Sequence, residues 1–431
     1  MDITVVGGGL AGVEAAYQLA SRGHSVSLFE MRPTRYSPAH KTPLLSELVC
    51  SNSLKSKELT NAHGLLKEEL RILGSIVINT ADQAAIPGGK ALVVDREIFA
   101  KRITREIEAN PLITVIRREI QDIPAGTVII ASGPLTSNAL AKRLAEITGV
   151  NNLFFFDAIS PIIDGGTVDM DKAFFGSRYD ENSDDYLNCP MTGEEYDAFY
   201  NALIGAEKVD LQPFEKTSFF EGCLPVEIMA QRGRQTLAYG PMKPVGLKDK
   251  TTGKEPYAVL QLRRENMAGT MYNMVGFQTK LTYAEQDRVF RMIPALRNAV
   301  FLRYGSIHRN TYINSPALLN NSLCLKGQDQ TFFAGQITGV EGYVESVAMG
   351  LVAGISAHVS IMNQVFSPPP EDTCVGALLN YITTPNDNFQ PMNINFGLIK
   401  NYRKRGKEKF IHNALQAISL WNEEIDEISK K

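Results

Sequence analysis

The sequence predicts an α/β protein, built on a Rossmann-like domain of the two-dinucleotide-binding-domain type with an inserted α+β domain. Three observations predict this fold. A glycine-rich turn separates a short apolar strand from a helix within residues 1–30, and two later apolar strands, 128–131 and 331–334, each end at a Ser-Gly or a Gly. Between about 156 and 320, aromatic and acidic residues are interleaved and Gly and Pro are frequent, which indicates a second, mixed domain.

The size and composition are those of an ordinary globular protein. The chain has 431 residues, enough for two or three domains, with 44% hydrophobic and 21% charged residues. A net charge of −3 gives no overall attraction to polyanions, so any nucleic-acid contact needs a local basic patch. Five scattered cysteines, an odd number with no CxxC pair, indicate reduced thiols rather than a disulfide framework or a metal site.

The first βαβ unit carries the clearest motif. Ile3–Val6 is a buried strand, and Gly7-x-Gly9-x-x-Gly12 leads into a helix. In this pattern the first glycine permits a tight turn, the second lets a pyrophosphate approach the backbone, and the third lets helix and strand pack closely. The helix N-terminus offers free N–H groups to the phosphates, and Glu30 ends the next strand where a ribose would lie. The expected dinucleotide contacts are Gly7, Gly8, Gly9, Leu10, Ala11, Gly12, Glu30, Met31 and Arg32.

Two further segments favour FAD over NAD as this dinucleotide. The strand 128–131 runs into Ser132-Gly133, and the strand 331–334 runs into Gly335-Gln336, followed by Gly339. Flavoproteins of this type return under the flavin at such a glycine, usually with an acid after it, where this chain has Gln336. No second GxGxxG is present, so a nicotinamide reductant would visit the flavin directly. Disulfide-reductase chemistry is excluded because Cys50 has no neighbouring partner cysteine.

The pattern predicts three regions along the chain. Residues 1–155 and 325–370 form the FAD-binding domain, 156–324 the inserted domain, and 371–431 a C-terminal appendage with a basic helix near 400–410. The apolar stretch 343–362 carries Glu345 and His358, so a buried helix is expected rather than a membrane span. The N-terminus shows no targeting signal, and we expect a cytoplasmic protein.

Two cysteines are candidates for chemistry. Cys50 lies in the loop 46–55, where related folds approach the flavin, and Cys223 lies in an aromatic-flanked Gly-Cys-Leu-Pro turn. A free cysteine is more often a small buried apolar residue, and that is the expectation for Cys189, Cys324 and Cys374.

Taken together, these motifs resemble the folate- and FAD-dependent tRNA (uracil-5-)-methyltransferases. The resemblance runs through the glycine-rich opening, Glu30-Met31-Arg32-Pro33, the Cys50 loop, the segment 221–225 and Gly335–Tyr343, to about residue 360. The flavoproteins of wobble-uridine modification share the opening but differ in the cysteine loops and have a longer C-terminal extension.

The resemblance implies a mechanism. 5,10-Methylenetetrahydrofolate would supply a one-carbon unit to reduced FAD, with NADPH or NADH as reductant, for transfer to carbon 5 of a T-loop uridine in tRNA. Cys223 would add to carbon 6 of the uracil, and Cys50 would accept a proton or guard the other thiol. His308 and Tyr343 are candidates for folate contact. The basic run 400–409 offers Arg403, Lys404 and Arg405 to RNA, with smaller patches at Arg232 and Arg234 and at Arg263 and Arg264.

Other functions stay open on the sequence. The glycine motifs fit equally a flavin-dependent oxidoreductase of a small molecule, or a flavin-bearing RNA-binding protein without activity. A ribosomal RNA uridine would require the same chemistry as a tRNA uridine. The choice between NADPH and NADH and the oligomeric state are also open.

Overall fold

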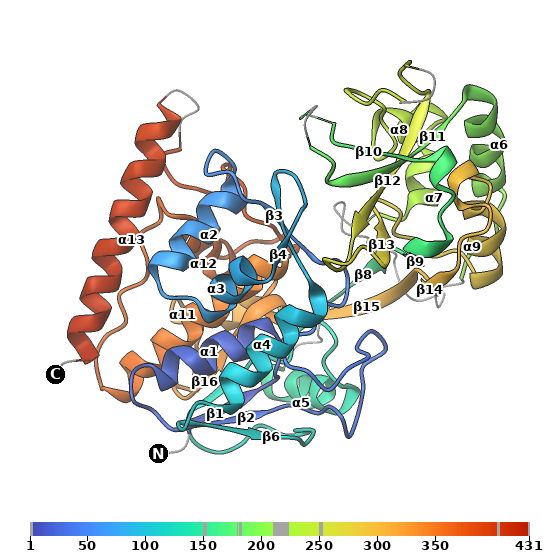
Figure 1. Ribbon diagram of the computed structural model, residues 1–431. Coiled ribbons are helices and arrows are strands. Elements are labelled where there is room, and N and C mark those ends of the chain that lie inside the picture. The colour runs from blue at the N-terminus through green and yellow to red at the C-terminus, as the bar shows by residue number, and fades with distance from the viewer. Residues whose placement is uncertain are drawn as a thin grey trace.

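The computed structural model describes residues 3–149, 153–178, 180, 183–209, 224–249, 253–402 and 406–429. Figure 1 shows two lobes, and both termini lie in the larger one. The smaller lobe consists of the middle of the chain. Two hydrophobic cores correspond to these lobes, one built from residues of both ends of the chain and one from residues 163–299.

A five-stranded parallel sheet forms the centre of the larger lobe, with the strand order β16-β7-β1-β2-β6. Its strands are β1 (Ile3–Val6), β2 (Val26–Phe29), β6 (Ile113–Ile116), β7 (Val128–Ile130) and β16 (Thr331–Phe333). β1, β7 and β16 are buried along their whole length, as expected for predominantly apolar strands covered on both faces. The sheet brings the glycine turn after β1 beside the glycines after β7 and β16, as the sequence predicts.

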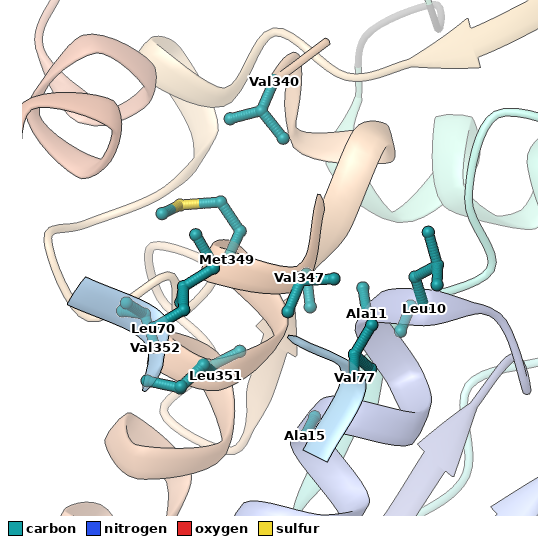
Figure 2. Close-up of a cluster of buried hydrophobic side chains, with 14 of the residues drawn as sticks. Leu10, Ala11, Ala15, Leu70, Val77, Val340, Val347, Met349, Leu351 and Val352 are labelled. Carbon is teal, nitrogen blue, oxygen red and sulfur yellow. The ribbon is translucent and has the colours of Figure 1, made fainter. Parts of the chain in front are cut away.

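The sheet is covered by α1 (Leu10–Ala20) and α11 (Tyr343–Ile361), which pack closely together (Figure 2). Two small residues of α11 permit this approach. A Cβ on Gly350 would lie 2.3 Å from the carbonyl oxygen of Ala11, and one on Gly354 would lie 2.9 Å from that of Ala15. In the described part of the chain, α11 is the one helix long and apolar enough to span a membrane, but 89% of its apolar stretch is buried inside the protein. The expectation of a buried core helix is confirmed.

Further helices complete the larger lobe around this pair. They are α2 (Ala62–Ile72), α3 (Ile76–Gln83), α4 (Arg96–Glu108), α5 (Asn138–Thr148), α10 (Ser315–Leu318), α12 (Cys374–Thr383) and α13 (Lys407–Ser429). The larger lobe also contains a small antiparallel sheet with the order β3-β5-β4: β3 (Ser53–Ser56), β4 (Ala85–Ile86) and β5 (Ala91–Val94). Short 3-10 turns occur at Gly165–Thr167, Met170–Lys172, Pro294–Leu296 and Gly335–Thr338.

The C-terminal residues are part of the larger core, not a separate appendage. α12 buries Val375 and Leu378, and α13 buries Ile418 and Trp421 in the same cluster as the Rossmann-like sheet. Of the basic helix expected near 400–410, the described residues from Lys407 onward are helical.

The smaller lobe is a mixed domain around a six-stranded antiparallel sheet, with the order β10-β11-β12-β13-β9-β14. Its strands are β9 (Ile162–Asp164), β10 (Phe174–Gly176), β11 (Tyr186–Met191), β12 (Ala258–Arg264), β13 (Met271–Met274) and β14 (Phe301–Arg303). Its helices are α6 (Gly193–Ile204), α7 (Val226–Gln231), α8 (Gln235–Tyr239) and α9 (Tyr283–Phe290).

An antiparallel ribbon of β8 (Leu153–Ile159) and β15 (Ser306–Tyr312) joins the two lobes. Tyr312, the last residue of β15, and Ile313, Leu319, Leu323, Cys324 and Leu325 after it already pack in the larger core. The chain therefore returns to the nucleotide-binding domain near residue 312, earlier than the boundary at 324 that the change in composition suggested.

Candidate functional site

The glycines of the turn after β1 differ in their surroundings: Gly7 and Gly12 are tightly packed, whereas Gly9 borders open space. Gly7 has φ +111°, and a Cβ there would lie 2.4 Å from the carbonyl oxygen of Ala131. A Cβ on Gly12 would lie 1.8 Å from the carbonyl oxygen of Gly7, so this glycine holds α1 against the turn. A Cβ on Gly9 would meet nothing within 4 Å. Gly7 and Gly12 thus serve the fold, whereas Gly9 faces a space at the N-terminus of α1 where an anion is stabilised.

That space belongs to a long cleft along the carboxyl ends of the parallel strands, which we call the nucleotide cleft. Most of the residues that the sequence assigned to the dinucleotide line it: Gly7, Gly8, Gly9, Leu10, Ala11, Glu30, Met31, Arg32, Ser132, Gly133 and Gln336. Gly12, Gly335 and Gly339 are not in its lining. A Cβ on Gly335 would lie 2.6 Å from Cβ of Ala11, and one on Gly339 would lie 2.3 Å from the ring of Phe389. These three glycines shape the cleft through packing.

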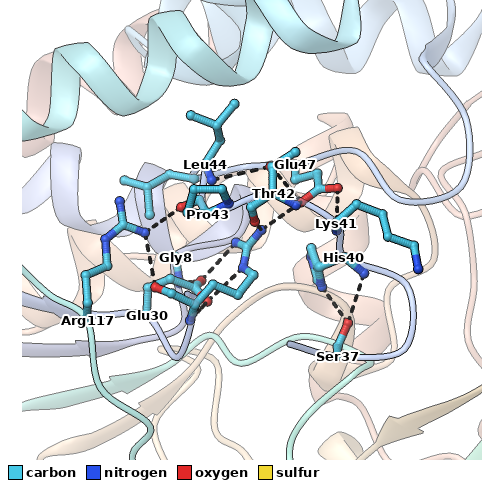
Figure 3. A network of polar contacts seen from close by, with 12 residues as sticks. Gly8, Glu30, Ser37, His40, Lys41, Thr42, Pro43, Leu44, Glu47 and Arg117 are labelled. Carbon is cyan, nitrogen blue, oxygen red and sulfur yellow. Dashed lines mark hydrogen bonds and ion pairs between the residues drawn. The ribbon is translucent and has the colours of Figure 1, made fainter. Parts of the chain in front are cut away.

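Glu30, at the end of β2, organises one end of this cleft (Figure 3). Its Oε2 accepts a hydrogen bond from the backbone N–H of Gly8 at 3.0 Å, and its Oε1 accepts from Arg32 Nε at 2.9 Å. Burial raises the pKa of Glu30, but the hydrogen bonds and charge of Arg32 outweigh it, and the net pKa is lowered. The carboxylate is therefore charged and fixes the glycine turn as well as lining the cleft.

Arg32 extends this network into the loop that follows β2. Its Nη1 donates to Glu47 Oε2 at 3.0 Å and its side chain is 1% exposed. Glu47 in turn accepts from the backbone N–H groups of Lys41 and Thr42, at 2.9 and 3.0 Å. Figure 3 shows Glu47 and Thr42 on this loop above Glu30. The arrangement fixes the start of the segment that leads to Cys50.

A second cleft opens where the nucleotide cleft ends, and we call it the thiol cleft. The two share Val49, Pro134, Leu135, Gln336 and Tyr343. The thiol cleft is also lined by Cys50 and His308. Three residues that the sequence singled out, Cys50, His308 and Tyr343, are thus brought together from three distant segments beside the predicted flavin position.

Tyr343, the first residue of α11, holds the loop that carries Cys50. Its hydroxyl oxygen accepts hydrogen bonds from the backbone N–H groups of Cys50, at 2.7 Å, and Ser51, at 3.1 Å. Burial, together with the nearby Cys50, raises the pKa of Tyr343, so the hydroxyl keeps its proton. The Cys50 side chain is only partly buried. Tyr343 therefore positions this thiol at the cleft in addition to lining it.

Two partly buried arginines hold the same loop from the other side. Arg96, at the start of α4, donates to the carbonyl oxygen of Leu48 and forms an ion pair with Glu265 at 2.8 Å. Arg303, at the end of β14, donates to the carbonyl oxygen of Val49. No sequence pattern pointed to either residue, because their partners are brought near only by the tertiary fold. Their guanidinium groups hold the loop through two successive backbone carbonyl groups.

Arg263 differs from its prediction as an RNA-facing patch. It is 8% exposed and donates through Nη2 to Ser51 Oγ at 2.8 Å. It supports the Cys50 loop and does not present its charge at the surface.

His308 lies on β15 and is neutral near pH 7. Burial, with the charges of Arg303 and Lys41, lowers its pKa to about 4. Its Nε2 lies 3.0 Å from Ser306 Oγ. Asp157 is its cross-strand partner on β8, so the two side chains share one face of the ribbon, and both line the thiol cleft.

Gln336 stands where related flavoproteins have an acid, and it is paired with one. Its amide Nε2 donates to Glu341 Oε2, and both residues line the thiol cleft. Burial and the nearby Asp157 raise the pKa of Glu341 well above its usual range. A protonatable carboxyl group thus lies beside Gln336, five residues after the position where the pattern would place it.

The comparisons with known proteins identify the family of this chain. The family model of glucose inhibited division protein A (GIDA) matches residues 2–365. The methylenetetrahydrofolate--tRNA-(uracil-5-)-methyltransferase TrmFO of Syntrophus aciditrophicus is 54% identical over 432 residues, 98% of each chain. The TrmFO of Geobacter sulfurreducens is 56% identical over 94% of each chain. The chain belongs to the TrmFO family.

A solved structure supports the fold of this TrmFO-family chain. Aquifex aeolicus GidA in its form II crystal superposes with a TM-score of 0.71 at 16% identity, covering 98% of this chain and 73% of that one. The Rossmann-like class with an additional domain, predicted from the sequence, is confirmed.

Some residues that the sequence singled out lie outside the described part of this TrmFO-family chain: Cys223, Arg403, Lys404 and Arg405. Cys189, Cys324 and Cys374 are buried. Burial raises the pKa of Cys324 to about 11, which suits an interior thiol and not a nucleophile. Within the described ranges, no group of three or more His, Cys, Asp or Glu residues could hold a metal ion.

Proposed function

We propose that this chain transfers a one-carbon unit from 5,10-methylenetetrahydrofolate, through reduced FAD, to carbon 5 of a T-loop uridine in tRNA, forming 5-methyluridine. The observation that carries the proposal is the junction of the two clefts at Val49, Gln336 and Tyr343, with Cys50 beside it. The 54–56% identity to TrmFO proteins over nearly the whole chain supports the same function.

The nucleotide cleft fits FAD. The open space at Gly9 and the N-terminus of α1 suit the pyrophosphate, and the Glu30 end suits the adenosine ribose. Pro134, Leu135 and Gln336 would line the flavin end, because they border both clefts. The reducing equivalents and the carrier for the one-carbon unit would come from FAD bound there. The reductant would be NADPH or NADH, which would reach the flavin through the thiol cleft.

The thiol cleft fits the folate and the uracil. His308 is neutral and presents a flat ring for stacking, and Tyr343 fixes the backbone of the Cys50 loop. A target uracil would have to leave its RNA stack to reach this depth. Cys223 would then add its thiolate to carbon 6, and carbon 5, made nucleophilic by this addition, would bond to the one-carbon unit. Loss of the carbon 5 proton would expel the thiolate and restore the 5,6 double bond, and a hydride from reduced FAD would complete the methyl group. Cys50 would accept that proton or guard the other thiol.

The basic segment at residues 400–409 would contact tRNA phosphates. In its described part, Lys400 is paired with Glu371 and Lys407 lies 4.7 Å from the ring centre of Phe396. The remaining charges of this segment are the better candidates for RNA. A tRNA substrate would also place the protein in the cytoplasm.

Trapping with a fluorinated substrate tests the proposed nucleophile. In tRNA that contains 5-fluorouridine, fluorine blocks the final proton loss, so the wild type should become covalently bound to RNA. Cys223→Ala should not be trapped, whereas Cys50→Ala should still be, with slow turnover on normal tRNA. The buried Cys324→Ala is the control and should be trapped like the wild type. Trapping that survives in Cys223→Ala and is lost in Cys50→Ala would reverse the two roles.

A further inference from the structure

One buried asparagine connects the Cys50 loop to both lobes. Asn52 is 0% exposed. Its Nδ2 donates to the carbonyl oxygen of Val94 on β5 at 2.9 Å and to that of Arg264 on β12, also at 2.9 Å. Its Oδ1 accepts from Arg263 Nε at 3.0 Å. β5 belongs to the larger lobe and β12 to the inserted domain, so a single side chain bridges the two.

The Asn52 side chain makes three hydrogen bonds inside the protein. Both amide hydrogens and one oxygen lone pair are engaged, and each partner is a backbone carbonyl or a buried guanidinium group. The backbone is tied in as well, because the Val94 N–H donates to the Asn52 carbonyl oxygen at 3.0 Å. A buried amide with both donors and its oxygen engaged fixes one arrangement of its surroundings.

The position of Asn52 gives this bridge a consequence for the thiol. Cys50 lies two residues earlier, and the intervening Ser51 is held by Arg263 from β12. The inserted domain therefore holds the loop at two adjacent residues, Ser51 and Asn52. From the larger lobe it is held by Tyr343 and Val94. The direction of the Cys50 side chain depends on how the two lobes are placed.

We propose that Asn52 is a positioning residue, which sets the Cys50 thiol at the cleft by fixing its loop to β5 and β12 together. The inference rests on the proposed function for its catalytic readout, and on the structure alone for its effect on the loop. Asn52 does not touch the reacting atoms, and it acts through Cys50.

The test compares three FAD-loaded variants of the full chain, two at Asn52 and one control. Asn52→Ala removes all three side-chain bonds, and Asn52→Asp keeps the acceptor for Arg263 but loses both donors to Val94 and Arg264. Both should lower kcat for 5-methyluridine formation about tenfold or more, with flavin content and KM for methylenetetrahydrofolate unchanged. In hydrogen–deuterium exchange, a peptide covering residues 48–53 should exchange about tenfold faster in both variants. An Asn52→Asp variant with wild-type kcat and loop exchange would show that the two donor bonds are not the link.

The control is Asn188, a buried asparagine of the same kind on β11. It is 0% exposed, its Nδ2 donates to the carbonyl oxygens of Phe174, Gly176 and Tyr186, and its Oδ1 accepts from Gln261. Asn188→Ala should destabilise the inserted domain but leave kcat and the exchange of residues 48–53 as in the wild type. Equal losses in Asn188→Ala would reduce Asn52 to a folding role and overturn the proposal. If the wild type forms no 5-methyluridine, the proposed function fails, while the exchange measurement still decides the role of Asn52.

Discussion

The hydroxyl oxygen of Tyr343 accepts a hydrogen bond from the backbone N–H of Cys50 at 2.7 Å and joins the start of the core helix α11 to the reactive loop. Removing this hydroxyl group should make the loop more mobile. Tyr343→Phe leaves two partly buried amides without their acceptor, a loss of about 1–3 kcal/mol that falls on the loop rather than the whole fold. Methyl transfer should fall about tenfold, and FAD should still bind.

Tyr196→Phe is the matched control for this prediction. The Tyr196 hydroxyl donates to the carbonyl oxygen of Arg234 in the core of the inserted domain, away from the clefts. The Tyr196→Phe variant should lose a comparable amount of stability and keep the methyl-transfer activity of the wild type. Equal activity in Tyr343→Phe and the wild type would show that this hydroxyl does not position the loop.

Gly9 and Gly12 should respond differently to the same substitution. Gly9→Val places its side chain in open space, so the protein should fold and purify without flavin. Gly12→Val would drive Cβ against the carbonyl oxygen of Gly7, 1.8 Å away, so folding itself should fail. The flavin absorbance per chain and the thermal midpoint, measured on both variants, separate the two effects. Full flavin occupancy in a folded Gly9→Val protein would mean that the pyrophosphate lies elsewhere.

The buried His358 should make stability sensitive to acid. Its Nδ1 lies 2.8 Å from His24 Nε2 and its Nε2 lies 3.1 Å from Ser429 Oγ, so it ties α13 to α11. Burial, with the charges of Arg22 and His24, lowers its pKa to about 4. The unfolded chain therefore takes up this proton first, and stability is lost as the pH falls from about 6.5 towards 4. The loss amounts to at most about 3 kcal/mol, since each pKa unit corresponds to about 1.36 kcal/mol.

Urea unfolding at several pH values between about 7 and 4, the range that spans this titration, measures the effect. His358→Gln should flatten the dependence, because the unfolded chain no longer has that extra proton to bind. The exposed His412, on the same helix as Ser429, should leave the dependence unchanged when replaced by Gln. An unaltered pH dependence in His358→Gln would assign the acid sensitivity to other groups.

The basic segment before α13 should carry part of the salt dependence of tRNA binding. Replacing Arg403, Lys404 and Arg405 by Gln should weaken binding. The slope of log K against log salt concentration should fall by about 0.7–0.9 for each RNA phosphate that the variant no longer neutralises. Flavin content should stay the same. An unchanged slope would identify these residues as a solvated surface.

The nucleotide-binding half of the site could be predicted from the sequence, because its signals are local. The turn Gly7–Gly12, the buried strands and the acid at Glu30 are each encoded within a few neighbouring residues, and the structure places nearly all of them at one cleft. The cysteine loop shows the opposite case. Arg303 and Val49 are 254 positions apart, and no local sequence pattern predicts that the arginine at the end of β14 donates to the carbonyl oxygen of Val49.

The domain limits differ from their prediction for a related reason. Composition changes gradually along the chain, whereas membership of a core depends on which apolar side chains meet. α13 has an ordinary amphipathic pattern, and only its packing shows that Ile418 and Trp421 complete the core of the nucleotide-binding lobe. Residues 312–325 are likewise irregular in sequence and belong to that core by contact.

The most direct test of the account follows the methyl carbon. The purified, FAD-loaded protein is given tRNA that lacks 5-methyluridine, methylenetetrahydrofolate labelled with ¹³C at its methylene carbon, and NADPH or NADH. The account predicts one labelled methyl group per tRNA, on carbon 5 of the T-loop uridine, and none with Gly9→Val. A product that forms only with S-adenosylmethionine, or the absence of labelled 5-methyluridine under these conditions, would contradict it.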